Sequence, residues 1–120
     1  MNEEVTAYID TVSDERKPLY EKLQTLVMDL YPEARIVMTA QIPTYRLKFG
    51  WVGLGYTDDG VSLYTSGPQH LVEFRKSNPS IKATKNSIEF KLTDDIPEDD
   101  VQQIVKHAFE EVGQPRGRKS

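Results

Sequence analysis

The stretch from Gln41 to Tyr64, QIPTYRLKFGWVGLGYTDDGVSLY, constrains the fold more than any other part of the sequence. Tyr45, Leu47 and Phe49 stand at every second position, with polar or basic residues between them. This alternation is typical of strands with one buried face. Two glycine-containing interruptions divide the stretch, so it predicts three antiparallel strands joined by two tight turns.

The second turn, at Asp59-Gly60, also predicts how its two strands pair. A two-residue turn there places Tyr56 opposite Leu63 and Gly55 opposite Tyr64. The face that the helices cover is then expected to hold Leu54, Tyr56, Val61 and Leu63. The opposite, open face is expected to hold Gly53, Gly55, Ser62 and Tyr64.

Helical periodicity occurs on both sides of this stretch. It predicts a short helix around Val5 to Val12, a second helix from the cap residue Ser13 to Tyr31, a short one after Pro68, and a closing helix that ends before Gly113. Two further strands are expected, at 36–40 on a sheet edge and at 87–92. The predicted fold is α+β, with a single antiparallel sheet and the N- and C-terminal helices packed mainly on one face.

Composition indicates one domain, at residues 1–112, followed by a basic disordered tail at 113–120. Three of the 15 basic residues lie in that tail and none of the 19 acidic residues does, so residues 1–112 carry a net charge of −7. An acidic body disfavours nucleic acid and is compatible with cations. The chain has no cysteine and no apolar run long enough to span a membrane, so a cytoplasmic monomer or homodimer is expected.

Few residues suggest chemistry. Five carboxylates lie within residues 94–100, but acids at a helix start stabilise the helix dipole without a metal, and that interpretation is preferred. His107 is interpreted as a residue of a solvated helix end rather than as a metal ligand, and His70 is interpreted in the same way. No nucleophile, phosphate-binding or dinucleotide motif occurs, so the chain is not expected to be an enzyme.

The open sheet face is the candidate binding surface. Glycines leave room beside an aromatic ring there, and cationic side chains project nearby, so a small anionic or planar ligand or a protein partner can be accommodated. The residues predicted to bind are Tyr45, Arg46, Tyr64 and Lys85. In the competing interpretation, the glycines only let the tyrosine ring lie flat on the backbone.

Several short motifs, in order along the chain, resemble the YdhG-like family of small bacterial proteins. They are Tyr8-Ile9, Pro18 near a helix start, Ile42-Pro43-Thr44-Tyr45-Arg46-Leu47, Val52-Gly53, Leu63-Tyr64 and Lys85-Asn86-Ser87-Ile88-Glu89-Phe90. The resemblance implies a frataxin-like fold and the role of an intracellular iron chaperone. The acids nearest the region where frataxin carries its acidic ridge are Glu3, Glu4, Asp10, Asp14 and Glu15. The resemblance assigns no individual iron ligand.

Overall fold

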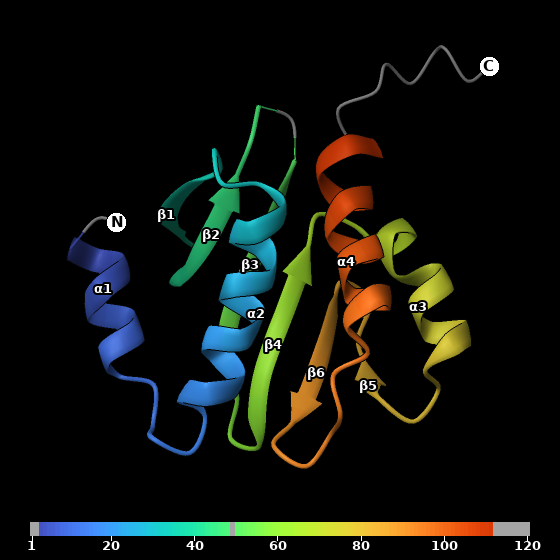
Figure 1. Cartoon of the computed structure of the whole chain (residues 1–120), viewed down its shortest axis with the longest axis horizontal. Coiled ribbons are helices and arrows are strands. Elements are labelled where there is room, and N and C mark those ends of the chain that lie inside the picture. Colours follow the sequence, from blue (N-terminus) through green and yellow to red (C-terminus); the bar gives the residue numbers. More distant parts are fainter. Residues whose placement is uncertain (1–2, 49, 112–120) are drawn as a thin grey trace.

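The computed structural model of the chain describes residues 3–48 and 50–111, so Phe49 and the predicted tail at 113–120 lie outside it. Its centre is a six-stranded antiparallel sheet with the strand order β1-β2-β3-β4-β6-β5 (Figure 1). The strands are β1 (Arg35–Thr39), β2 (Ile42–Arg46), β3 (Trp51–Tyr56), β4 (Gly60–Thr65), β5 (Lys82–Ala83) and β6 (Ser87–Lys91). The α+β prediction with one antiparallel sheet is confirmed, and β1 is an edge strand as expected. The two-residue strand β5 was not predicted.

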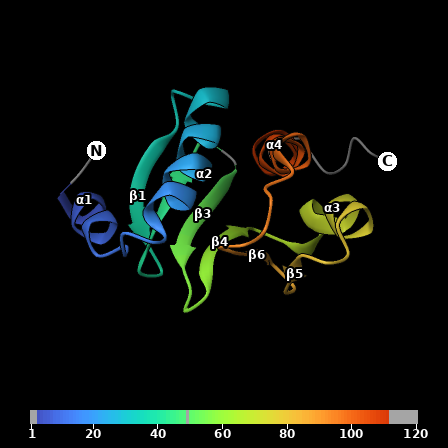
Figure 2. The same ribbon diagram turned by 60° about the horizontal axis from the view of Figure 1, so that its bottom comes forward.

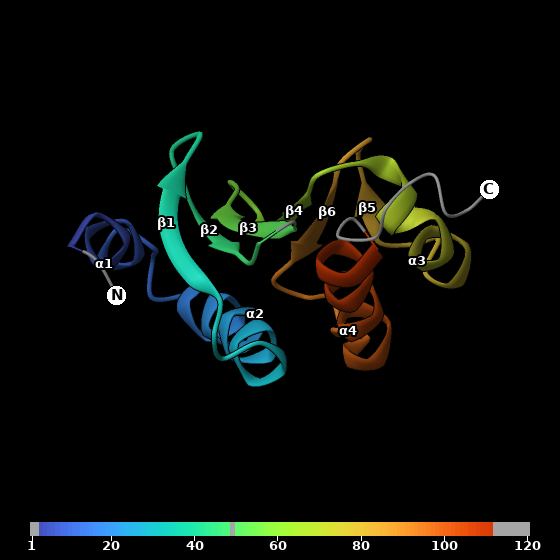
Figure 3. The same ribbon diagram turned by 90° about the horizontal axis from the view of Figure 1, so that it is seen from above.

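The described residues form four α-helices, which lie on one face of this sheet or beside its edges. They are α1 (Glu3–Asp10), α2 (Lys17–Leu30), α3 (Val72–Ser77), which follows the 3-10 turn η1 (Pro68–Leu71), and α4 (Glu98–Lys106), which continues into the π-helical turn η2 (His107–Glu111). Figures 2 and 3 show α2 and α4 on one face of the sheet, with α1 beside β1 and α3 beside β5. Within the described residues, no helix is long and apolar enough to cross a membrane.

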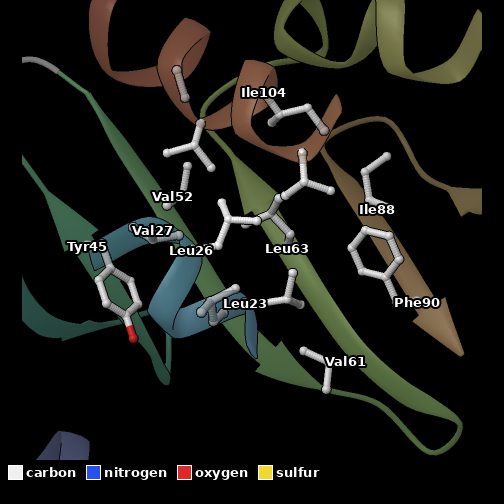
Figure 4. Close-up of a cluster of buried hydrophobic side chains, with 14 of the residues drawn as sticks. Leu23, Leu26, Val27, Tyr45, Val52, Val61, Leu63, Ile88, Phe90 and Ile104 are labelled. Carbon is white, nitrogen blue, oxygen red and sulfur yellow. The ribbon is translucent and has the colours of Figure 1, made fainter. Parts of the chain in front are cut away.

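The core lies between α2, α4 and the sheet (Figure 4). The helices contribute the stripes that helical spacing predicted, including Leu23 and Val27 from α2 and Ile104 from α4. The strands contribute Leu54, Val61 and Leu63, all of which are buried on the predicted face. Tyr56 shares that face but is 39% exposed, because it lies at the end of β3. Its ring packs against the ring of Tyr8.

The β3–β4 hairpin turns one residue earlier than predicted. Thr57 donates its N–H to the carbonyl of Gly60, so the two turn residues are Asp58 and Asp59. Tyr56 therefore pairs with Val61 and Gly53 with Tyr64, two residues away from the predicted register. A slip of two keeps every side chain on its own face, so the face assignment is right although the pairs were wrong.

Gly60 has a different role from the predicted one. Its φ is not positive, so the turn does not require glycine. A Cβ at this position would lie 1.8 Å from the Phe90 carbonyl oxygen, so the absence of a side chain is what allows β4 to approach β6.

The β1–β2 hairpin has a tight turn that no turn motif in the sequence predicts. Thr39 pairs with Ile42, which leaves only Ala40 and Gln41 as the turn residues. Their φ angles are 53° and 70°, the left-handed values that two-residue hairpin turns require and that favour asparagine and glycine. Ala and Gln are unfavourable there, because left-handed backbone costs about 1–2 kcal/mol for a residue with a Cβ.

Pro43 lies inside β2. The β2–β3 pairs run from Arg46 with Trp51 to Thr44 with Gly53, and the next position would place Pro43 opposite Leu54. Proline has no N–H to donate, so the Leu54 carbonyl loses its partner in the sheet. The hydroxyl of Tyr20, on α2, donates to this carbonyl over 2.9 Å.

A second tyrosine forms a hydrogen bond with the next backbone group of β3 that has no partner in β2. The N–H of Tyr56 donates to the hydroxyl oxygen of Tyr8, on α1, over 3.2 Å. The place where β2 leaves β3 is therefore closed by side chains from both N-terminal helices.

Replacing the β1–β2 turn with the sequence that its backbone favours should stabilise the protein. The double variant Ala40→Asn with Gln41→Gly is expected to raise the free energy of unfolding by about 1 kcal/mol, because it removes left-handed strain at two positions. Urea unfolding followed by circular dichroism measures the change. The matched control is Asp58→Asn with Asp59→Gly in the other hairpin, where neither residue has a positive φ. An equal gain in both variants would show that the strain is not the cause.

Removing the Tyr20 hydroxyl should be more costly than removing another buried tyrosine hydroxyl. Tyr20→Phe is expected to lower the free energy of unfolding by about 1–3 kcal/mol, because it leaves the Leu54 carbonyl buried without a partner. Tyr45 is equally buried, and its hydroxyl approaches the Gln24 side chain without forming a hydrogen bond of good geometry with the described residues. Tyr45→Phe should therefore cost less, and equal losses in the two variants would contradict the role assigned to Tyr20.

Candidate functional site

The structure does not gather the four residues predicted to bind on the open face. Tyr45 is completely buried on the helix-covered face, next to α2 (Figure 4), so placing it on the open face was wrong. Burial also raises the pKa of the Tyr45 phenol above its usual value of 10. Arg46 is exposed at the end of β2, Tyr64 is half-buried in β4, and Lys85 is exposed between β5 and β6.

The space above the open-face glycines is filled by side chains of the protein itself. A Cβ on Gly53 would lie 2.7 Å from Ile42 Cδ1, and one on Gly55 would lie 3.1 Å from Ile42 Cγ2 and 3.4 Å from Tyr64 Cε1. The Ile42 and Tyr64 side chains therefore lie over the two glycines. This is the competing interpretation of the sequence, in which glycine makes room for a ring rather than for a ligand.

The acidic cluster at 94–100 has structural partners, in line with the preferred interpretation. Asp94 accepts a hydrogen bond from the Lys91 N–H, Asp100 accepts one from the Asn78 side chain, and Glu98 forms an ion pair with Lys22. Across residues 3–48 and 50–111, no group of three or more His, Asp or Glu side chains is placed to hold a metal ion. The same result holds for the N-terminal acids that the resemblance suggested, because all of them lie within the described residues.

A cleft of about 420 Å³ lies between the α3 and α4 segments, and both histidines line it. His70 comes from η1 and is 4% exposed, whereas His107 opens η2 and is half-buried. Their Nδ1 atoms are 2.5 Å apart, and their rings meet edge to face with centroids 4.7 Å apart. The remaining lining residues are Gln69, Glu73, Phe74, Ser77, Asp100, Gln103, Ile104, Lys106 and Glu110.

The neighbours of His70 determine where its proton lies. The Gln69 side-chain nitrogen, which can only donate, is 3.4 Å from His70 Nε2, and the Ser66 hydroxyl is 3.1 Å from the same atom. With the Gln69 amide in this orientation, His70 Nε2 is assigned as the acceptor, so the ring carries its proton on Nδ1 and donates it to His107 Nδ1. His107 must then carry its own proton on Nε2.

The π-helical turn η2 places His107 and the residues that follow it. Gly50, at the start of β3, lies against this turn, and a Cβ there would be only 2.3 Å from the Ala108 carbonyl oxygen. Ala108 and Phe109 are buried, and Phe109 packs against the Tyr31 ring with centroids 4.7 Å apart. The backbone of η2 therefore packs against Gly50, while the His107 side chain contacts His70 in η1. Such turns are often found at functional sites.

Carboxylates give the cleft a negative character. Glu73 and Glu110 each follow a histidine by three residues, so the same His-x-x-Glu spacing occurs on both sides of the cleft. The Tyr31 hydroxyl donates a hydrogen bond to Glu110. Burial raises the pKa of Tyr31, and this hydrogen bond raises it further. Asp100 adds a third carboxylate and Lys106 a compensating cation.

This arrangement can bind a cation or relay a proton. Two imidazole nitrogens facing each other are a donor set suited to first-row transition metals. Two nitrogens on one tetrahedral metal are about 3.4 Å apart, so the rings must separate by about 0.9 Å to admit an ion. The hydrogen-bonded series Ser66, His70 and His107 can also pass a proton between its members.

The sequence prediction missed this histidine pair because the two residues are 37 positions apart and meet only when α3 packs beside α4. Each histidine alone is unremarkable in the sequence. The repeated spacing in His70-Leu71-Val72-Glu73 and His107-Ala108-Phe109-Glu110 is the signal that could have connected them.

Comparison with known proteins gives a family and a fold. The family model described as "Domain of unknown function (DUF5655)" matches residues 5–112. The chain belongs to the DUF5655 family. The fold is similar to that of a solved Bacillus subtilis protein described as a member of the DUF1801 family, YdhG, with a TM-score of 0.76, over 88% of this chain and 89% of that chain. The identity is 10%, so the similarity concerns the fold. No curated protein matches the sequence.

Proposed function

We propose that this DUF5655 domain is a non-enzymatic binding protein that takes up a divalent first-row transition metal, with ferrous iron as its cargo. The observation that carries the proposal is the 2.5 Å approach of His70 Nδ1 and His107 Nδ1 within the α3–α4 cleft. The resemblance of the sequence motifs to the YdhG-like family, which implies the role of an iron chaperone, supports the choice of iron as the cargo.

Two imidazoles suit transient binding. For both Nδ1 atoms to bind the metal, the His70 proton would move from Nδ1 to Nε2, and water would complete the coordination. Two neutral imidazoles bind without net loss of a proton, so binding should weaken only in acid, where protons compete with the metal for the rings. A site with two protein ligands also holds its ion less firmly than a closed structural site with four. Weak retention is what a protein needs if it must hand its metal on.

The charge of the surroundings favours a cation. Glu73, Asp100 and Glu110 line the cleft against one lysine, Lys106, and the body of the chain is acidic as a whole. Such a field raises the local concentration of divalent ions. Imidazole and carboxylate groups together are ligands that ferrous iron accepts. The histidine site is therefore preferred to the exposed N-terminal acids as the place of binding.

Anaerobic titration of the untagged protein with Fe(II), recorded by NMR, tests the proposal. The chain contains two histidines, so a carbon–proton spectrum contains two histidine Cε1–H signals, one for each ring. Both should broaden together below the concentrations that broaden the carboxylate-rich surface. His107→Gln should weaken binding at least about tenfold, because even residues behind metal ligands change affinity 10–100-fold.

The matched control changes the acidic cluster instead. Asp95→Asn with Asp99→Asn removes two exposed carboxylates and should leave the affinity nearly unchanged, because exposed charges several residues away are screened. Broadening that follows the acids and survives His107→Gln would contradict the histidine site. Absence of residue-specific broadening at low millimolar Fe(II) would contradict metal binding altogether.

A further inference from the structure

A separate cationic feature lies on β1 and β2, away from the histidine cleft. Arg35 and Arg46 are directly opposite each other in the β1–β2 register, and both are exposed. Paired residues in an antiparallel sheet share a face, so the two guanidinium groups project from the same side. Like charges in this position destabilise a sheet unless a counter-charge lies between them.

Among residues 3–48 and 50–111, neither arginine forms an ion pair or a side-chain hydrogen bond. Other exposed cations of the chain do find carboxylates, as Lys22 does with Glu98 and Lys82 with Glu89. The arginine pair is therefore a local excess of positive charge on a protein whose body is acidic.

The pair borders a hollow rather than a flat surface. Glu33, Arg35, Arg46, Leu47 and Lys48 line a hollow of about 360 Å³. Three cations and one carboxylate leave a local net charge of +2, and the half-buried Leu47 supplies an apolar wall. The volume lies in the range of small-molecule sites, about 300–1,000 Å³.

We propose that Arg35 and Arg46 bind the phosphate group of a small soluble ligand, with Lys48 adding charge at the rim. Guanidinium groups present paired N–H donors that match phosphate oxygens, and charge-assisted hydrogen bonds of this kind are about twice as strong as neutral ones. A bound dianion would neutralise the cross-strand repulsion. This inference uses residues outside the histidine cleft and does not depend on the proposed metal.

Isothermal titration with inorganic pyrophosphate tests the site at constant ionic strength. The wild-type chain should bind, and Arg35→Gln and Arg46→Gln should each weaken binding by about tenfold or more, as expected for the loss of one charge-assisted contact of about 1.4 kcal/mol. Lys91→Gln is the matched control, because Lys91 is an exposed cation on β6, near the opposite edge of the sheet. It should bind as the wild type does.

A stability measurement accompanies the titration, so that a folding defect cannot pass for lost binding. Without phosphate, Arg35→Gln should unfold at a higher urea concentration than the wild type, since it relieves the like-charge pair. Pyrophosphate should raise the wild-type midpoint and raise that of the variant less. Equal shifts in all variants, or no binding by the wild type, would overturn the proposal.

Vesicles of phosphatidic acid in phosphatidylcholine distinguish a free phosphate from a lipid headgroup. Co-sedimentation that requires both arginines, without pyrophosphate binding, would overturn the soluble ligand and assign the site to a headgroup. Pyrophosphate binding without co-sedimentation supports the soluble ligand.

Discussion

The hydrogen bond from the Tyr20 hydroxyl to the Leu54 carbonyl joins α2 to the sheet at the point where β2 and β3 stop pairing. Pro43 cannot donate to that carbonyl, so β2 must part from β3. A buried carbonyl without a partner would cost about 1–3 kcal/mol. Tyr20 and Tyr8 bind the two backbone groups of β3 that have no partner in β2, and thereby fix α2 and α1 against the same edge of β3. The proline and the two tyrosines form one structural unit, although they come from separate parts of the sequence.

Alternation in the sequence was enough to assign the faces of the central strands. Leu54, Val61 and Leu63 are buried where period-two spacing placed them, even though the hairpin turns one residue earlier than Asp59-Gly60 indicated. A period of two tolerates a slip of two, which is why the error in register did no harm. The Ala40-Gln41 turn could not be predicted, because its residues lack the preference for left-handed backbone that identifies such turns. The edge strand β5 was missed because two residues carry no periodicity.

The candidate sites could not be predicted in this way, because they depend on packing between elements that are distant in the sequence. Tyr45 follows the alternation into the core and away from the open face, where Ile42 and Tyr64 fill the space that the glycines leave. His70 and His107 come together only through the contact of the α3 and α4 segments, and the repeated His-x-x-Glu spacing does not by itself predict that contact. The Arg35–Arg46 pair likewise needs the register of β1 with β2, and that register depends on a turn that the sequence hides.

The functional account depends on the two histidine rings meeting across the α3–α4 cleft. The most direct test is a two-bond proton–nitrogen correlation spectrum of the uniformly ¹⁵N-labelled, metal-free protein at neutral pH. The structure predicts that the His70 ring is protonated on Nδ1 and the His107 ring on Nε2, with a scalar coupling between the two Nδ1 atoms across their hydrogen bond. Two rings that are both protonated on Nε2, with no coupling between them, would contradict the site.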